Sequence, residues 1–173
     1  MTAPPDRRAP ALEIDIQAAS PLWAAQPRAA DIVRAAIAAA ASVRQVEGEV
    51  SVLLTDDAAI RALNRDWRQI DKPTNVLSFP AANDAIKDAS KATSGTFVGD
   101  IVIAYETLAR ECADEDHDFL HHLAHLTVHG FLHLIGYDHQ TDAQADEMEG
   151  LESRIMLSMN MPDPYLARDL ERS

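Results

Sequence analysis

The sequence predicts a single-domain α+β or α/β layer structure with four strands and five helices, and of the two classes we favour α+β. Three observations lead to this prediction. The chain has 173 residues, of which 47% are hydrophobic, which suffices for one core. Short strand-like segments are interspersed with longer segments in which apolar residues recur every three or four positions. The chain contains no internal repeat and no linker that would separate a second domain.

Four segments have the patterns of strands. Leu12–Ile16 alternates apolar and acidic residues, which is typical of a strand with one buried face. Val50–Leu54 and Asn75–Phe79 are short apolar runs bounded by turn residues. Phe97–Ile103 ends in three consecutive β-branched residues, which we expect to be buried on both faces.

Five segments have the patterns of helices. Thr55 or Asp56 can cap the second of them, which carries Ile60, Leu63, Asn64 and Trp67 on one face. This helix ends before Pro73, because proline disfavours helical geometry at the residue before it. A capping box, Thr141-Asp-Ala-Gln144, begins the last helix. The predicted helices are Ala29–Val43, the segment between Asp56 and Asp71, Tyr105–Cys112, Asp116–Ile135 and Thr141–Met159.

Charge and cysteine content limit the possible functions. Fifteen basic and 28 acidic residues give a net charge of −13, which excludes a broad basic surface for nucleic acid. Any nucleic-acid contact must therefore come from a local patch.

A single cysteine, Cys112, excludes an intramolecular disulfide and fits a reducing compartment. We find no signal-like segment and no apolar stretch of the roughly 20 residues that a membrane span needs, so we expect a cytoplasmic protein without membrane contact.

All seven histidines lie between residues 117 and 139. His129 and His133 are four residues apart, so on a helix they share a face and can reach one ion. Gly136 can adopt the left-handed conformation that ends a helix, and the turn would bring His139 back as a third ligand. Three nitrogens with one open position are typical of catalytic zinc. The alternative is a pair of buried, hydrogen-bonded histidines and an unrelated surface one, and we favour the metal site.

This spacing equals that of the zinc-protease motif His-Glu-x-x-His-x-x-Gly-x-x-His, with one difference. Gly130 occupies the position of the glutamate that takes a proton from metal-bound water in such proteases. The sequence therefore argues against peptide hydrolysis by that route.

The remaining histidines have less specific positions. His125 and His121 lie one and two turns before His129, where partners of the metal ligands, alternative ligands and partly exposed residues are the alternatives, and we favour the last. We interpret His117 and His122 as surface residues. Asp138 either orients a ligand imidazole or hydrogen-bonds within its own turn.

A stripe of cations precedes the third strand. Arg61, Arg65, Arg68 and Lys72 follow helical spacing, and an arginine fork matches phosphate oxygens. For Arg61 and Arg65 we favour a solvated helix face. The polar residues beside the third strand are expected to hydrogen-bond with structural partners: Thr74, Asn75 and Ser78.

Three blocks of this sequence, Asn64–Pro80, Val98–Ile103 and His125–His139, resemble the YbeY family of endoribonucleases, and the similarity continues through Met148 and Glu152. The resemblance implies a mixed four-stranded sheet packed with helices. It also implies one Zn²⁺ per chain, held by His129, His133 and His139 near the end of a long central helix. The functionally essential arginine of the family falls on Arg68. Ala104 stands where the family often has serine, which does not touch the presumed chemistry.

Three functional hypotheses follow. The first, which we favour, is a zinc-dependent, single-strand-specific endoribonuclease that matures ribosomal RNA at the 16S 3′ end and serves ribosome quality control, with the rRNA precursor and the ribosome or ribosomal proteins as partners. The second is a metal-dependent amide or ester hydrolase. The third is a non-catalytic, zinc-containing ribosome assembly factor. In the favoured hypothesis residues 11–160 are one metal-hydrolase domain, residues 1–10 a disordered lead-in and residues 161–173 a C-terminal tail.

Overall fold

The structure is a computed structural model that describes residues 12–81 and 96–166, so the predicted lead-in of residues 1–10 lies outside it. Over the described residues the chain forms four strands and five α-helices, as the sequence predicts. A 3-10 helix, Pro21–Ala25, precedes the first α-helix. The strands are β1 (Leu12–Ala18), β2 (Gly48–Thr55), β3 (Val76–Pro80) and β4 (Phe97–Ala104), and the helices are α1 (Ala29–Arg44), α2 (Asp57–Arg68), α3 (Tyr105–Glu115), α4 (Phe119–Leu134) and α5 (Asp142–Ser158).

The strands form one mixed sheet in the order β1-β2-β4-β3. β1, β2 and β4 are parallel, and β3 pairs antiparallel with β4 at the edge. The predicted mixed four-stranded sheet is therefore confirmed. β3 is an edge strand of the described sheet, and its alternate residues Val76, Ser78 and Pro80 line the pocket described below.

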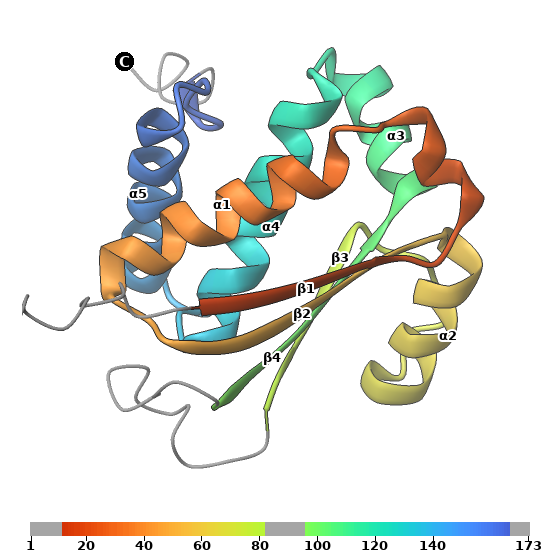
Figure 1. Ribbon diagram of the computed structural model, residues 1–173, viewed down its shortest axis with the longest axis horizontal. Helices are drawn as coiled ribbons and strands as arrows, with labels where there is room; N and C mark the ends of the chain where they lie inside the picture. The colour runs from red at the N-terminus through yellow and green to blue at the C-terminus, as the bar shows by residue number, and fades with distance from the viewer. Residues whose placement is uncertain (1–11, 82–95, 167–173) are drawn as a thin grey trace, which may run out of the picture.

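Helices pack on both faces of the sheet: α1 and α4 lie on one face and α2 on the other (Figure 1). β4 shows why both faces are covered. Ile101 and Ile103 belong to the main core with α1 and α4, whereas Val102 and Ala104 pack in a second cluster with Ile60 of α2. The prediction that this strand is buried on both faces is confirmed.

Side-chain caps determine where several helices begin. Asp56 accepts a hydrogen bond from the Ala59 backbone N–H at 2.9 Å, so of the two predicted candidates Asp56 caps α2. The capping box predicted at Thr141 is present at the start of α5. α4 begins at Phe119, three residues later than predicted, because Asp118 caps it.

The residues predicted to share one face of α2 differ in burial. Ile60 and Asn64 are buried, but Trp67 is 69% exposed. Its helix ends beside the edge strand β3, where the indole meets the ring of Phe79 with centroids 6.2 Å apart.

None of the described helices combines the length and apolar character that crossing a bilayer requires.

Candidate metal centre

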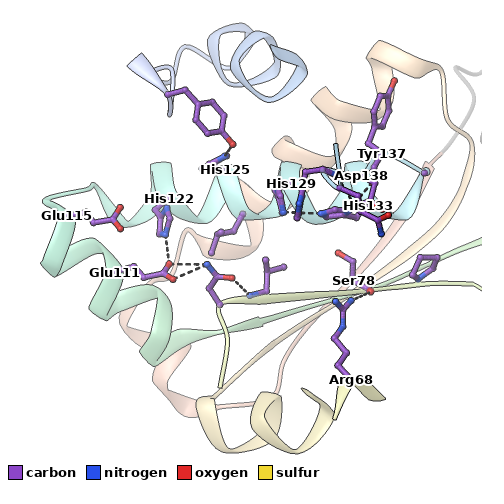
Figure 2. Close-up of a pocket in the computed structure, with 18 residues that line it drawn as sticks. Arg68, Ser78, Glu111, Glu115, His122, His125, His129, His133, Tyr137 and Asp138 are labelled. Atoms are coloured by element: carbon purple, nitrogen blue, oxygen red, sulfur yellow. Dashed lines mark hydrogen bonds and ion pairs between the residues drawn. The ribbon is translucent and has the colours of Figure 1, made fainter. Parts of the chain in front are cut away.

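The helix α4 carries a row of histidines along one pocket. His122, His125, His129 and His133 all line this pocket, whose volume is about 840 Å³. Figure 2 shows these side chains projecting from α4, with Arg68 reaching toward the same space from α2. The opposite side of α4 packs into the main core through Leu132 and other apolar residues. The helix is therefore fixed by its buried face while its histidine face borders the pocket.

The three predicted ligands come together. One ligand atom each from His129, His133 and His139 can be chosen so that all three lie within 4.8 Å of one another. His129 and His133 approach through their Nε2 atoms, which are 3.1 Å apart. This separation is close to the roughly 3.3 Å expected between two nitrogens bound about 2.05 Å from one tetrahedral zinc. The predicted convergence of the three histidines is thus a property of the structure.

Gly136 makes the turn that returns His139 to the helix. Its φ is +102°, a conformation that side chains other than glycine rarely adopt. The Tyr137 backbone N–H donates to the Leu132 carbonyl at 3.0 Å, which closes the end of α4. The role predicted for this glycine is confirmed.

Hydrogen bonds at the far ring nitrogens orient two of the ligands toward a cation. His133 Nδ1 lies 2.9 Å from the Tyr137 carbonyl oxygen, which only accepts, so Nδ1 must carry the proton. His129 Nδ1 lies 2.6 Å from Glu152 Oε1 and donates to that carboxylate. When both Nδ1 atoms donate and both rings are neutral, the two Nε2 atoms are unprotonated and lie 3.1 Å apart, as two ligands of one cation do. The three histidines are thus able to hold a metal ion.

Glu152 is a buried carboxylate behind the three histidines, and no role of its own is predicted for it from the sequence. Its side chain is 1% exposed and accepts hydrogen bonds from His129, from His125 Nε2 at 3.0 Å and from the Tyr165 hydroxyl. Burial raises the pKa of Glu152, but the hydrogen bonds from His125 and His129 outweigh it and lower the pKa to about 2. The group is therefore ionised at neutral pH and orients His129, as a carboxylate commonly does behind a metal-bound histidine.

His133 stays neutral at pH 7. Burial, followed by the neighbouring His129 and His139, lowers the pKa of His133 to about 4. Metal ligation requires the neutral imidazole, so proton competition at this ligand is weak near neutral pH.

Arg68, the predicted phosphate-binding residue, lines the same pocket. Its Nη2 donates to the Ser78 carbonyl oxygen of β3 at 3.2 Å. Ser78 in turn donates through its hydroxyl to the Gly130 carbonyl at 2.9 Å, which ties β3 to the turn of α4 that carries His129. Arg68 and the histidines are thus positioned through one short chain of contacts. The structural role predicted for Ser78 is confirmed.

The structure corrects the interpretation of His122. Rather than lying on the surface, its side chain is 12% exposed, and Nε2 lies 2.7 Å from Glu111 Oε2. Glu111 also accepts from Asn75 Nδ2 at 2.9 Å, so the polar residue beside β3 has the predicted structural partner. His117 is exposed, as predicted.

For three other residues the contacts in the structure decide between the alternative interpretations. His121 is 44% exposed and does not line the pocket, so among the described contacts it is no partner of the ligands. His125 contacts Glu152 and is a partner of the ligand set. Asp138 accepts from the His139 backbone N–H at 2.8 Å, which is a bond within its own turn.

Arg61 and Arg65 pair with neighbouring aspartates on the solvated helix face, as predicted.

Gly130 lies against the sheet and not in the pocket. A Cβ there would sit 3.1 Å from Ser78 Oγ, 3.2 Å from Ile101 Cγ2 and 3.3 Å from Val76 Cγ2. These contacts are tighter than most Cβ contacts, so a side chain at this position would press on β3 and β4 instead of projecting freely into the pocket. The packing of this helix therefore argues, with the sequence, against a protease base at this position.

The fold and the site define a single-domain α+β protein with a cluster of three histidines that could hold a metal ion. Comparison with known proteins identifies the family: the model of the endoribonuclease YbeY family matches residues 16–160, and the chain belongs to this family. Endoribonuclease YbeY of Bradyrhizobium sp. (strain BTAi1) is 51% identical over 168 residues, covering 95% of this chain and 98% of that protein. Endoribonuclease YbeY of Rhodopseudomonas palustris (strain BisB5) is 49% identical over 165 residues, covering 92% and 84%. The solution structure of TM1509 from Thermotoga maritima is 22% identical, with a TM-score of 0.47 and coverage of 85% and 91%.

Proposed function

We propose that this protein is a zinc-dependent endoribonuclease that cuts single-stranded RNA and acts in maturation of the 16S rRNA 3′ end and in ribosome quality control. The observation that carries the proposal is the convergence of three histidine ligand atoms within 4.8 Å of one another, with the Nε2 atoms of His129 and His133 3.1 Å apart, in a pocket that Arg68 also lines. Membership of the endoribonuclease YbeY family supports RNA as the substrate.

His129, His133 and His139 would hold the ion, since three neutral imidazoles are a common donor set for catalytic zinc. Zinc bound there supplies Lewis-acid chemistry and makes water available as a nucleophile near neutral pH. Glu152 and the Tyr137 carbonyl keep two of the rings in the tautomer that directs Nε2 to the ion. Glu152 lies on the buried face of α5, and Tyr137 lies in the turn that follows α4.

Arg68 would bind the phosphodiester and neutralise charge that develops at phosphorus. A guanidinium has five N–H donors, so its bond to the Ser78 carbonyl fixes the fork while leaving donors for phosphate oxygens. A preorganised cation of this kind stabilises the transition state more than the ground state. Arg68 therefore needs to be charged and correctly placed, but it is not needed to hold the metal.

The two other hypotheses have less support. Amide hydrolysis by the protease route lacks its general base, because Gly130 faces the sheet. A metal that only fixes the helix turn would not require an arginine on the pocket wall. We propose the ribosome or a ribosomal protein as partner, since an acidic chain of net charge −13 gains little from general attraction to RNA. We propose the cytoplasm as its location.

The decisive experiment compares His133→Ala and Arg68→Glu in purified protein. The parent should hold about one zinc per chain and cut single-stranded RNA. His133→Ala should lose both zinc and cleavage, whereas Arg68→Glu should keep zinc and lose cleavage. Cleavage at the parental rate by Arg68→Glu would show that Arg68 does not act on the phosphate. Turnover of peptides without RNA cleavage would support the amide hydrolase instead.

The role in ribosome maturation is tested in cells whose only copy is His133→Ala. Immature 16S 3′ ends should accumulate in these cells, and normal rRNA processing would contradict the proposed role.

A further inference from the structure

An exposed tryptophan stands out on the helix that carries Arg68. Trp67 is 69% exposed, whereas the second tryptophan, Trp23, is 3% exposed and donates its indole N–H to the Thr55 carbonyl at 2.9 Å. A large aromatic ring left in solvent gives up the burial that normally stabilises it, so its exposure calls for a binding role. Ile70, 49% exposed, lies just beyond the end of the same helix.

Trp67 precedes Arg68, which lines the metal-centre pocket, but its ring lies on the α2 face of the sheet, around the edge strand β3 from the histidines. The next residue, Arg68, lines the pocket and is bonded to Ser78 of β3. The Trp67 ring contacts Phe79, with centroids 6.2 Å apart and planes inclined by 62°. Phe79 stands between Ser78 and Pro80, both of which line the pocket, while Phe79 itself packs with the α2 cluster. An RNA chain would have to run from the pocket past Arg68 and around the edge strand β3 to reach the indole.

The local charge differs from that of the whole chain. Residues 61–72 contain four cations and two carboxylates, 4 − 2 = +2, against −13 for the protein. The two carboxylates pair with Arg61 and Arg65, at 2.8 and 3.0 Å. A polyanion is thus attracted to the Arg68 end of α2 and repelled by most of the remaining surface.

We propose that Trp67 is a stacking site for a nucleobase of the single-stranded RNA substrate, beside the phosphate that Arg68 binds. The inference rests on the proposed function and adds a residue that positions the substrate. A single-stranded RNA offers phosphates and unstacked bases in turn, and an arginine followed by an exposed indole offers one partner for each. Any flat base can stack on the indole, so Trp67 confers a requirement for a base and for single-strandedness, not for a sequence.

The contrast between Trp67→Phe and Trp67→Leu tests stacking directly, because both keep apolar bulk but only phenylalanine keeps an aromatic face. In the zinc-loaded full-length protein, Trp67→Leu should raise KM for single-stranded RNA on the order of 5- to 150-fold with kcat nearly unchanged. Trp67→Phe should retain most of the parental affinity. Leu157→Ala, which truncates another exposed apolar residue on α5, 57% exposed, is the matched control and should leave KM unchanged.

Oligonucleotides with one abasic site, moved stepwise along the strand, locate the contact. In the parent, one abasic position should raise KM as much as Trp67→Leu does, and in Trp67→Leu the same position should have no further effect. A KM for Trp67→Leu within about twofold of the parent, or equal abasic penalties in both proteins, would overturn the inference.

These results separate the inference from the proposed function. Cleavage with an unchanged KM in Trp67→Leu means that the inference is wrong while the nuclease function stands. If the parent cuts no RNA, the affinities of the parent and of Trp67→Leu for labelled RNA still test the stacking site. Quenching of parental tryptophan fluorescence by RNA, together with lower affinity in Trp67→Leu, would support the stacking site while the proposed nuclease function fails. Equal RNA affinity in the two proteins would reject the stacking site, and a protein partner would then be the better candidate for this surface.

Discussion

Replacing Glu152 by glutamine should weaken metal binding without unfolding the protein. The carboxylate accepts hydrogen bonds from His129, His125 and Tyr165, and it is the acceptor that keeps the proton on His129 Nδ1. Glutamine has similar size and one acceptor oxygen, but it carries no charge and its amide nitrogen can only donate. The substitution therefore removes the charged acceptor behind the ligand while leaving little empty space.

Loss of such a partner costs 10- to 100-fold in metal affinity, which corresponds to about 1.4–2.7 kcal/mol. The upper half of this range is the better expectation here. Glu152 is fully buried and holds one ligand through a 2.6 Å bond, so water cannot replace it readily.

The assay is competition for zinc between the protein and a coloured chelator at pH 7.5, with thermal unfolding of the metal-free proteins as the test of folding. Glu147→Gln is the matched control, because it makes the same chemical change on the same helix at a side chain 62% exposed. Tyr165→Phe removes one donor to Glu152 and should weaken zinc binding by less than about tenfold. An unchanged zinc affinity in folded Glu152→Gln would refute the reasoning that this carboxylate orients His129.

Three further predictions concern stability and the protease-like spacing. Gly130→Glu should not create peptidase activity and should lower the free energy of unfolding by at least about 1–3 kcal/mol, because it overpacks the helix–sheet contact; a peptidase gain measured on a peptide library would contradict the orientation described here. Burial raises the pKa of Asp57, but hydrogen bonds from Thr107 and Arg110 lower the pKa overall. The ionised carboxylate therefore stabilises the fold fully above the pKa of the unfolded state, about 3.9. This stabilisation is lost as the pH falls through the lower pKa of the folded state. Asp57→Asn should therefore unfold more easily in denaturant at pH 7, and the difference from the parent should shrink toward pH 3; a constant difference would show that the charge of Asp57 contributes nothing. His122→Ala should cost about 1–2 kcal/mol in the same assay because Glu111 loses a partner, while the exposed His121→Ala should cost less than about 0.5 kcal/mol; equal costs would reject the buried placement of His122.

The error about His122 could have been avoided from the sequence. Extending the histidine row in steps of four from His129 leads to His125 and then His121. Each residue of an α-helix turns by about 100°, so eight residues leave His121 about 80° away from the direction of His129. Seven residues leave His122 only about 20° away, on the face that lines the pocket. The helical periodicity thus predicts that His122 shares the face of His129, and the same periodicity correctly predicted the position of His133.

Contacts between distant elements were beyond the reach of the sequence. α2 and α3 begin side by side, where the Asp57 carboxylate accepts from the Thr107 backbone N–H at 3.1 Å and Glu106 accepts from the Asp57 N–H at 3.0 Å. The helix N-terminus at Ala104, which has no side-chain cap of its own, is thus capped from another helix. Glu152 is a similar case, since 23 residues separate it from His129 and nothing in its local pattern indicates a buried charge.

The two glycines of the histidine motif explain why protease-like spacing serves a different site here. Gly136 allows the turn that any motif of this spacing needs, so its presence says nothing about the reaction. Gly130 differs, because it allows β3 to approach α4 closely enough for the Ser78 hydroxyl to bond the Gly130 carbonyl. That approach brings the Ser78 carbonyl, and with it Arg68, to the pocket of the three histidines. The absence of a side chain at this position therefore both removes a base suited to amide hydrolysis and admits a cation suited to a phosphodiester.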